Sequence, residues 1–304
     1  MNILVVGPGA VGGYFGGMLA KAGENVTFLA KEAYYNALTP AGLRIKSFKG
    51  DFSSKVHAIK GPSEIGNMDL ILMCVKSYDT EATAHQIKNN IDENTVVLSL
   101  QNGIDNTEKI GSILGRDNVI AGVVLLLAEV VSPWEIHHYS RSEIVMGETN
   151  NNVSSGLKKI VDVFNNANIL CSITNNIQKE QWKKLIWNTA FNPLTTLTRS
   201  TPKELLSVPE TELIVRKIMM ETLNVANKIG INIDGNIVNG HIESTRKLDN
   251  SKTSMLQDLV KGKRLEIDAI NGAVIAKGKE AGIPTPYNDI LYSLLKHLSV
   301  KAGS

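Results

Sequence analysis

Hydrophobic and polar positions follow two different patterns along the chain, and the change falls near residue 172. In the first part, short and nearly continuous apolar runs alternate with glycine-containing or polar segments, which is typical of buried parallel strands joined by helices. This pattern predicts an α/β domain over residues 1–172. We expect strands in residues 2–7, 25–30, 68–76, 95–103, 118–131 and 168–174, and a further strand pair in 136–148.

Helical periodicity dominates the second part, residues 173–304. We expect one helix to end before Gly230 and a longer one, beginning near Ser254, to end before Gly282. An isoleucine follows each glycine, which fits a glycine at the helix end with an apolar residue after it. The sequence therefore predicts an α/β domain followed by an all-helical domain, with the active site in the cleft between them.

Glycines cluster where the first expected strand meets the first expected helix. Gly7, Gly9 and Gly12 form the motif G-x-G-x-x-G inside a strand–helix–strand unit of about thirty residues. Gly7 would permit a tight turn, Gly9 would let a pyrophosphate approach the backbone, and Gly12 would let the helix pack closely on the strand. The alternative is a glycine-rich turn that binds no ligand. We predict a Rossmann-type dinucleotide site at the helix N-terminus, formed by Gly7, Pro8, Gly9, Ala10, Val11 and Gly12.

The end of the second strand bears on which dinucleotide binds. An NAD site usually carries Asp or Glu there, to hold the ribose 2′-hydroxyl. Here Ala30 occupies that position, and Lys31 and Glu32 follow. The cation at Lys31 suits a 2′-phosphate and favours NADP; the alternative is that Lys31 is a solvated loop lysine and Glu32 holds the ribose. Ligands of open α/β sheets bind at the carboxyl ends of strands, and three more candidates fall at or near such ends: Lys76, Asn102 and Ala128.

A row of polar residues interrupts an apolar segment of the helical part. Lys184, Asn188 and Asn192 recur every four residues in "QWKKLIWNTAFNPLTTL", residues 181–197, and so lie along one face of a helix. Buried amides must find hydrogen-bond partners, which a small polar substrate would provide. The row is therefore a buried hydrogen-bonding row or the wall of a site, and the alternative is a stripe that faces solvent.

A second polar cluster lies in "TSMLQD" and "KGKRLEIDAING". Ser254 and Gln257 match a capping box, S-x-x-Q, and the helix N-terminus that they would begin is a natural seat for a carboxylate. Glu266 follows about three helical turns later. The alternative for Glu266 is a surface acid beside Lys263 and Arg264.

Composition and charge limit the classes of partner. The 304 residues are 43% hydrophobic and 20% charged, as in ordinary globular proteins. A net charge of +2 without a basic run argues against a nucleic-acid partner. No apolar run reaches about 18 residues, so we expect no transmembrane helix, and the first residues lack the charged region of a signal peptide.

Cysteine and histidine positions indicate neither disulfides nor metal. Cys74 and Cys171 lie in apolar, strand-like stretches, which predicts buried thiols in a reducing cytoplasm. His137 and His138 are adjacent, but neighbouring residues of a strand point to opposite faces. Because no other Cys or His spacing matches a ligand set, we expect no metal site.

Five segments together carry a more specific resemblance. They are "GPGAVGG", "CVKSYDT", "SLQNGID", "WKKLIWNTAFNPLTTL" and "TSMLQD…LEIDAING", in this order. Over nearly the whole chain they resemble the ketopantoate reductase family. The resemblance implies a Rossmann domain, a helical domain and NADPH-dependent reduction of 2-dehydropantoate to (R)-pantoate, a step towards pantothenate and coenzyme A. It implies a cytoplasmic enzyme whose partner is a small 2-oxo acid, with neither nucleic acid nor membrane, and it leaves a homodimer open.

The resemblance also implies roles for single residues. Lys184 matches the catalytic proton donor and also contacts substrate, and Glu266 matches a contact to the cofactor ribose. The segment from Gly7 to Gly12 matches the pyrophosphate-binding turn. Family members often carry Arg where this chain has Lys31, and lysine is a point charge rather than a planar fork. The remaining implied contacts are to substrate for Asn102, Asn188, Asn192 and Ser254, and to the cofactor for Lys76, Asn102 and Ala128.

These residue types suit the reduction of a ketone. Hydride attack builds negative charge on the ketone oxygen, which a lysine ammonium stabilises and protonates. One rival is a 2-hydroxy acid dehydrogenase of the same superfamily with another side-chain pocket and NAD as cofactor. The other is a non-catalytic NADP-sensing module, against which the intact lysine argues because a sensor needs no proton donor.

Overall fold

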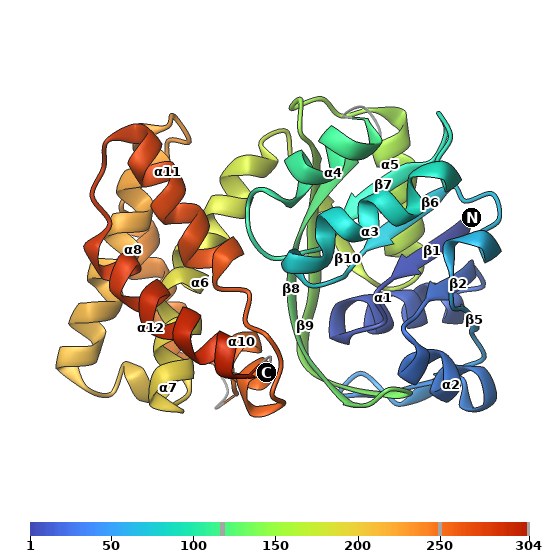
Figure 1. Cartoon of the computed structure of the whole chain (residues 1–304), viewed down its shortest axis with the longest axis horizontal. Coiled ribbons are helices and arrows are strands. Elements are labelled where there is room, and N and C mark those ends of the chain that lie inside the picture. Colours follow the sequence, from blue (N-terminus) through green and yellow to red (C-terminus); the bar gives the residue numbers. More distant parts are fainter. Residues whose placement is uncertain (116–118, 249–250, 303–304) are drawn as a thin grey trace. The chain divides into compact units, whose positions relative to one another are not determined.

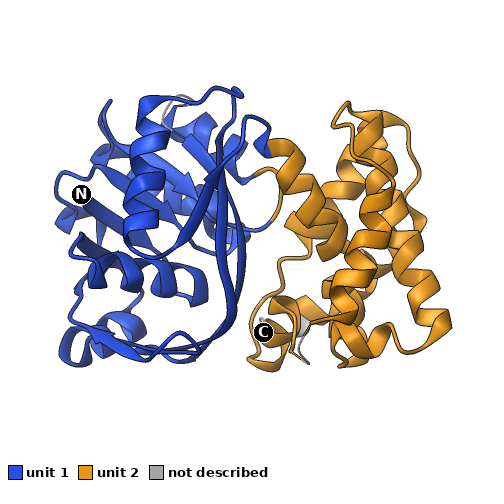
Figure 2. Cartoon of the chain, turned by 180° about the vertical axis from the view of Figure 1, so that it is seen from behind, with its two compact units in different colours: residues 1–102, 106–177 blue, residues 103–105, 178–304 orange. Residues whose placement is uncertain are grey.

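The computed structural model describes residues 1–115, 119–248 and 251–302, which form two compact units (Figures 1 and 2). Unit 1 comprises residues 1–102 and 106–177, and unit 2 comprises residues 103–105 together with the chain from Gln178 onward. From the sequence we predicted that the first domain ends at residue 172, whereas unit 1 extends to Ile177.

The described strands of unit 1 form a single sheet in the order β4-β3-β9-β8-β7-β6-β1-β2-β5, with β10 paired to β9. The strands β5, β2, β1, β6, β7 and the start of β8 run parallel, and β8 and β9 form an antiparallel hairpin. The carboxyl ends of β1, β2, β6 and β7 therefore meet at one edge. The bounds are β1 (Asn2–Val6), β2 (Asn25–Leu29), β3 (Leu43–Ser47), β4 (Phe52–Ser54), β5 (His57–Ile59), β6 (Leu70–Met73), β7 (Val96–Ser99), β8 (Val119–Ser132), β9 (Glu135–Glu148) and β10 (Leu170–Ile173).

Helices cover both faces of this sheet (Figure 1). In β1, Ile3 and Val5 join a core cluster with α1 and α5, whereas Leu4 and Val6 join a second cluster with α3 and α4. Burial on both faces explains the nearly continuous apolar runs in the sequence and confirms the α/β fold. The helices are α1 (Ala10–Lys21), α2 (Glu32–Ala41), α3 (Thr80–Ile87), α4 (Asn106–Leu114) and α5 (Ser155–Asn166).

Two expected strands are shorter than the sequence suggested. β6 ends at Met73 rather than Lys76, and β7 ends at Ser99, before the expected limit of residue 103. The residues after each strand form the turns that carry candidate ligand contacts. Asn118, at the start of the strand expected in 118–131, lies outside the described residues.

The described part of unit 2 is helical throughout (Figure 2). Helix α6 runs through its core, where Leu185, Ile186, Ala190 and Phe191 are at most 1% exposed. The helices are α6 (Ile177–Thr198), α7 (Pro202–Leu205), α8 (Pro209–Lys228), α9 (Asn236–Arg246), α10 (Ser254–Val260), α11 (Ala273–Ala281) and α12 (Pro286–Ala302), with a π-helical turn, η5 (Asp268–Gly272), before α11.

Two glycine helix ends are confirmed, and one expected helix is wrong. Gly230 and Gly282 have φ of 90° and 69° just after α8 and α11. The long helix expected from Ser254 to Gly282 breaks at Gly262, whose φ is 64°. The N–H of Lys263 donates across that glycine to the carbonyl of Asp258, at 2.8 Å. Because a lysine rather than an isoleucine follows Gly262, the sequence lacked the apolar signal that marked the other two helix ends.

Candidate active site

The turn between β1 and α1 has the geometry of a phosphate cradle. Gly7 has a φ of 94°, a left-handed conformation that favours glycine. A Cβ on Gly12 would lie 2.3 Å from the Gly7 oxygen and 2.9 Å from Cβ of Cys74, so only glycine permits this packing. A Cβ on Gly9 would meet nothing within 4 Å, which leaves open space at the start of α1.

At the start of α1, no side chain of the described residues accepts a hydrogen bond from the first backbone N–H groups, which face this open space. Gly9 is the N-cap of α1, with no side chain to bond the first N–H groups, and the first turn carries no acidic residue. An anion at this position would meet free N–H groups and the positive end of the helix dipole. The residues present therefore fit the pyrophosphate of a dinucleotide.

Lys31 lies directly after β2, at the N-cap of α2. Its side chain is 87% exposed, and its Nζ donates to Oδ2 of Asp79 at 3.2 Å. Asp79 belongs to the turn after β6, so this ion pair joins two segments that follow strands of the same sheet edge. Glu32 occupies the first turn of α2, with Nζ of Lys60 at 4.0 Å. The contacts leave both interpretations of the ribose end open and add Asp79, which no sequence signal connected to Lys31.

The segments that carry Lys76 and Asn102 lie side by side. Oγ of Ser77 donates to the Asn102 carbonyl at 3.0 Å, and Nδ2 of Asn106 donates to the same oxygen at 2.6 Å. Ala128 lies in β8 opposite His138, four residues before the strand ends at Ser132. Strand β8 continues past its last pairing with β7, because it forms a long hairpin with β9. Ala128 is buried in the core cluster on the α1 side.

The polar row of α6 is buried. Asn188 and Asn192 are 6% and 1% exposed, and Lys184 is half-buried, so the solvent-facing alternative is wrong. Both amide atoms of Asn192, Oδ1 and Nδ2, are buried without a hydrogen-bond partner among the described residues. An unpaired buried amide costs free energy that a polar ligand would recover. This favours a site wall over a self-contained hydrogen-bonding row.

Lys184 interacts electrostatically with Glu266, a residue that lies just before η5 in the chain. Glu266 is 6% exposed, so the alternative of a surface acid is wrong. Burial lowers the pKa of Lys184 to about 8, and the negative charge of Glu266 opposes this shift. An ammonium with such a pKa can give up its proton near neutral pH, as a general acid must.

The neighbouring Lys183 has a different environment. Its Nζ donates to Oε1 of Glu180 at 2.8 Å, one turn earlier on α6. Its backbone oxygen lies 2.9 Å from Nε2 of His241 in α9. Lys183 thus makes an ordinary helix-surface ion pair, whereas Lys184 is coupled electrostatically to Glu266.

Ser254 begins α10 but does not cap it. The N-cap is Thr253, whose Oγ1 accepts from the N–H of Leu256 at 3.3 Å, so the capping box expected from Ser254 and Gln257 is wrong. The sequence contained two adjacent capping residues, "TS", and the first one caps. Ser254 is exposed at the helix start, where its hydroxyl is not used in the cap.

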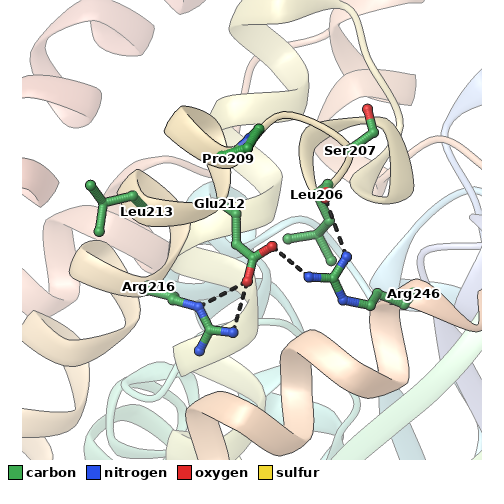
Figure 3. Close-up of a pocket in the computed structure, with 7 residues that line it drawn as sticks. All are labelled: Leu206, Ser207, Pro209, Glu212, Leu213, Arg216 and Arg246. Atoms are coloured by element: carbon green, nitrogen blue, oxygen red, sulfur yellow. Dashed lines mark hydrogen bonds and ion pairs between the residues drawn. The ribbon is translucent and has the colours of Figure 1, made fainter.

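A cavity of about 470 Å³ in unit 2 contains none of the predicted site residues (Figure 3). At its centre, Glu212 of α8 accepts from Nε and Nη2 of Arg216, at 3.0 and 2.7 Å, and from Nη2 of Arg246, at 2.5 Å. These hydrogen bonds hold the pKa of Glu212 below its usual value, and the bond from Arg216 contributes most to this effect. Since both arginines already serve this carboxylate, the cluster joins α8 to α9. The lining residues are Leu206, Ser207, Pro209, Glu212, Leu213, Arg216 and Arg246.

Three further features of the described residues bear on alternative sites: metal ligands, thiols and apolar helices. Within the ranges that the structure describes, no group of three His, Cys, Asp or Glu is placed to hold a metal ion. Cys74 and Cys171 are both free, and burial raises the pKa of each thiol, for Cys171 to about 12. No helix in the described part of the chain is long and apolar enough to span a membrane.

Two sequence profiles of one family together match most of the chain. The sequence profile described as "Ketopantoate reductase PanE/ApbA" matches residues 3–151, and the corresponding C-terminal profile matches residues 176–299. A 2-dehydropantoate 2-reductase from Pyrococcus abyssi is 32% identical over 97% of this chain and 97% of that protein. One from Nostoc sp. is 30% identical over 97% of this chain and 94% of that protein.

Solved structures are similar to this chain over its full length. A PanE/ApbA family ketopantoate reductase from Ralstonia eutropha has a TM-score of 0.93 at 32% identity, covering 100% of both chains. A D-mandelate dehydrogenase in a ternary structure with NADH and anilino(oxo)acetate has a TM-score of 0.94 at 27% identity, covering 100% of this chain and 99% of that one.

Proposed function

Because the chain belongs to the ketopantoate reductase family, we propose that it reduces 2-dehydropantoate to (R)-pantoate with NADPH and a proton from Lys184. The family and its named relatives make the protein an oxidoreductase with a nicotinamide cofactor. The observation that carries the finer proposal is the buried row of α6. In this row Lys184 shares a helix face with Asn192, whose side-chain amide has no hydrogen-bond partner among the described residues.

Substrate binding is assigned to the amides of this row. Asn192 offers one donor and one acceptor that the protein leaves unpaired, and a 2-oxo acid has a carboxylate and a carbonyl that match the donor. Asn188 lies one turn earlier on the same face, and Ser254 offers an exposed hydroxyl at the start of α10. Such groups fix a small acid in one orientation. Asn102, in unit 1, is proposed as a contact to both substrate and cofactor.

Lys184 is assigned the proton transfer. When bound, NADPH supplies the hydride to the ketone carbon. The Lys184 ammonium stabilises the negative charge that grows on the ketone oxygen and donates one proton to it, which leaves a neutral amine. Glu266 keeps the lysine charged beforehand, because its carboxylate raises the pKa that burial lowers. The amine regains its proton from solvent before the next turnover.

Cofactor binding is assigned to the glycine turn and to the residues that follow the strands. The open space at Gly9 suits the pyrophosphate, and Lys31 suits the 2′-phosphate of NADPH. Lys76 and Ala128 keep their proposed contacts to the cofactor, and Glu266 its proposed contact to the ribose.

A second candidate is the reduction of a different 2-oxo acid. The likeness to D-mandelate dehydrogenase, solved with NADH, favours this candidate because the same fold there serves an aromatic substrate and another cofactor. The two candidates share the α6 row and differ in the pocket around the substrate side chain.

A steady-state assay separates the candidates. The purified chain is assayed with NADPH and with NADH against 2-dehydropantoate, phenylglyoxylate, pyruvate and 2-oxoisovalerate. The proposal predicts the highest kcat/KM for 2-dehydropantoate with NADPH. A preference for phenylglyoxylate with NADH would support the second candidate, and no turnover with any acid would support the non-catalytic sensor.

Two further predictions accompany this proposal. The two free thiols, Cys171 buried and Cys74 half-buried, suit a reducing cytoplasm as the place of action, which fractionation of cells that express the chain would test. A homodimer is tested by sedimentation velocity of the purified protein.

A further inference from the structure

Helix α6 contains a proline at position 193, in the interior of the helix. In an α-helix the carbonyl of residue i accepts from the N–H of residue i+4. Proline has no N–H, so Pro193 leaves the carbonyl of Thr189 without its α-helical donor. Thr189 is fully buried, and solvent cannot replace that donor.

Asn271 supplies the missing donor from another element. Its Nδ2 donates to the Thr189 carbonyl at 3.0 Å and to Oδ1 of Asn288 at 2.9 Å, so both amide hydrogens are used. Asn271 lies in the π-helical turn η5 and is fully buried. Its own Oδ1 has no partner among the described residues, which indicates that the donors account for its place here.

The orientation of Asn271 is fixed by a chain of hydrogen bonds. Oε2 of Glu221 in α8 accepts from Nδ2 of Asn288 at 2.8 Å and from its backbone N–H at 3.0 Å. An ionised carboxylate and a backbone carbonyl can only accept. With an acceptor at each end, Asn288 must turn its oxygen to Asn271, and Asn271 must turn its nitrogen to Thr189.

The two ends of this link carry the proposed catalytic groups. Thr189 follows Asn188 directly and lies between Lys184 and Asn192 on α6, while Asn271 follows Glu266 by five residues. We propose that Asn271 is a positioning residue, which holds the Thr189 turn of α6 against the segment that carries Glu266 and so sets Lys184 relative to that carboxylate. This inference rests on the proposed function only for the roles of Lys184 and Glu266.

A double-mutant cycle between Asn271 and Pro193 tests the link. Asn271→Leu keeps the volume and removes both donors, and Pro193→Ala returns an N–H to the Thr189 carbonyl. We expect Asn271→Leu to lower kcat by about ten- to a hundred-fold, because a displaced catalytic group costs that much. We expect Pro193→Ala to recover part of both kcat and the free energy of unfolding in that background. If Asn271→Leu prevents folding, Asn271→Ser, which keeps one donor, takes its place. We again expect a lower kcat in the single variant and partial recovery when Pro193→Ala is added.

The pH profile separates positioning from plain stability. Weaker coupling to Glu266 would lower the pKa of Lys184, so the alkaline limb of kcat in Asn271→Leu should move to lower pH. Asn227→Leu is the matched control, since that amide also makes two hydrogen bonds, both to Ile233 after α8. The control should lose stability and keep its alkaline limb.

Two results would overturn the proposal. One is additive effects of Pro193→Ala and Asn271→Leu on the free energy of unfolding, a measurement that needs no substrate. The other is an unmoved alkaline limb in Asn271→Leu. A wild-type chain that prefers another 2-oxo acid would contradict only the proposed substrate, and the kinetic arms would then use that acid.

Discussion

The hydroxyl oxygens of Thr195 and Thr253 lie 2.7 Å apart and share a hydrogen bond. Thr195 lies on α6, one turn after Asn192, and Thr253 caps α10 directly before Ser254. The bond therefore joins the two elements that carry proposed substrate contacts, although 58 residues separate the two threonines along the chain. Because both hydroxyls are buried, the bond fixes one element against the other.

Replacing Asn192 by leucine should separate stability from binding. Both amide atoms of Asn192 are buried and unpaired in the unliganded protein, and an apolar residue of similar shape removes that cost. We expect Asn192→Leu to raise the free energy of unfolding by roughly 1–2 kcal/mol, while the KM for 2-dehydropantoate rises at least about tenfold and the Kd for NADPH stays nearly constant. Urea unfolding and steady-state kinetics measure these effects. A variant that is destabilised with an unchanged KM would show that Asn192 serves the core.

The pH profile should report on Lys184. Burial holds its pKa at about 8, below the ordinary 10.5, and only the protonated form can donate. We therefore expect kcat at saturating NADPH to be flat below this pKa and to fall above it. Glu266→Gln removes a charge that raises the pKa, so the fall should move to lower pH. Glu280→Gln, which removes an exposed acid paired with Lys277, is the control and should leave the profile in place.

Two glycines of the cofactor turn should respond differently to alanine. A Cβ on Gly9 meets nothing in the unliganded protein, so Gly9→Ala should keep its stability within about 0.5 kcal/mol. It should nevertheless weaken NADPH binding at least about tenfold, since the methyl group occupies the approach of the pyrophosphate. Gly12→Ala should lose roughly 1–3 kcal/mol of stability, because its Cβ would press on the Gly7 oxygen. Normal NADPH binding by Gly9→Ala would argue against the assigned phosphate site.

Lys31 should determine the choice between NADPH and NADH. We expect Lys31→Ala to raise the KM for NADPH by about ten- to thirty-fold and to leave the KM for NADH nearly unchanged, because only NADPH carries the 2′-phosphate. Lys158→Ala removes an equal charge from α5 and should change neither KM. Equal kcat/KM for the two cofactors in the wild type would contradict the preference itself.

The sequence predicted the elements that follow a single period. The apolar runs of the central strands, the glycine turn and the apolar face of α6 are local patterns, and the structure reproduces them. The edge strands β3, β4 and β5 were not predicted, because three- to five-residue strands with exposed positions show no clear period. The break at Gly262 was not predicted because a polar residue follows that glycine.

The site residues were predictable by type and not by environment. The spacing of Lys184, Asn188 and Asn192 placed them on one face, but only packing shows that this face is buried. Contacts around the site come from distant segments: Asn271 bonds to Thr189, beside Asn188, across 82 residues, and Asp79 bonds to Lys31 across 48. No local pattern predicts such pairs, because tertiary contacts alone bring them together.

The most direct test of the account compares two adjacent lysines. Lys183 and Lys184 point about 100° apart on α6, one paired with Glu180 and the other coupled to Glu266. The measurement is kcat for 2-dehydropantoate, at saturating NADPH, in Lys184→Ala and Lys183→Ala. Loss of a proton donor predicts a decrease of at least about a hundred-fold in Lys184→Ala, with the Kd for NADPH preserved, and a change within about tenfold in Lys183→Ala. A Lys184→Ala enzyme with near-normal kcat, or an inactive Lys183→Ala enzyme, would contradict the assignment of Lys184 as the general acid.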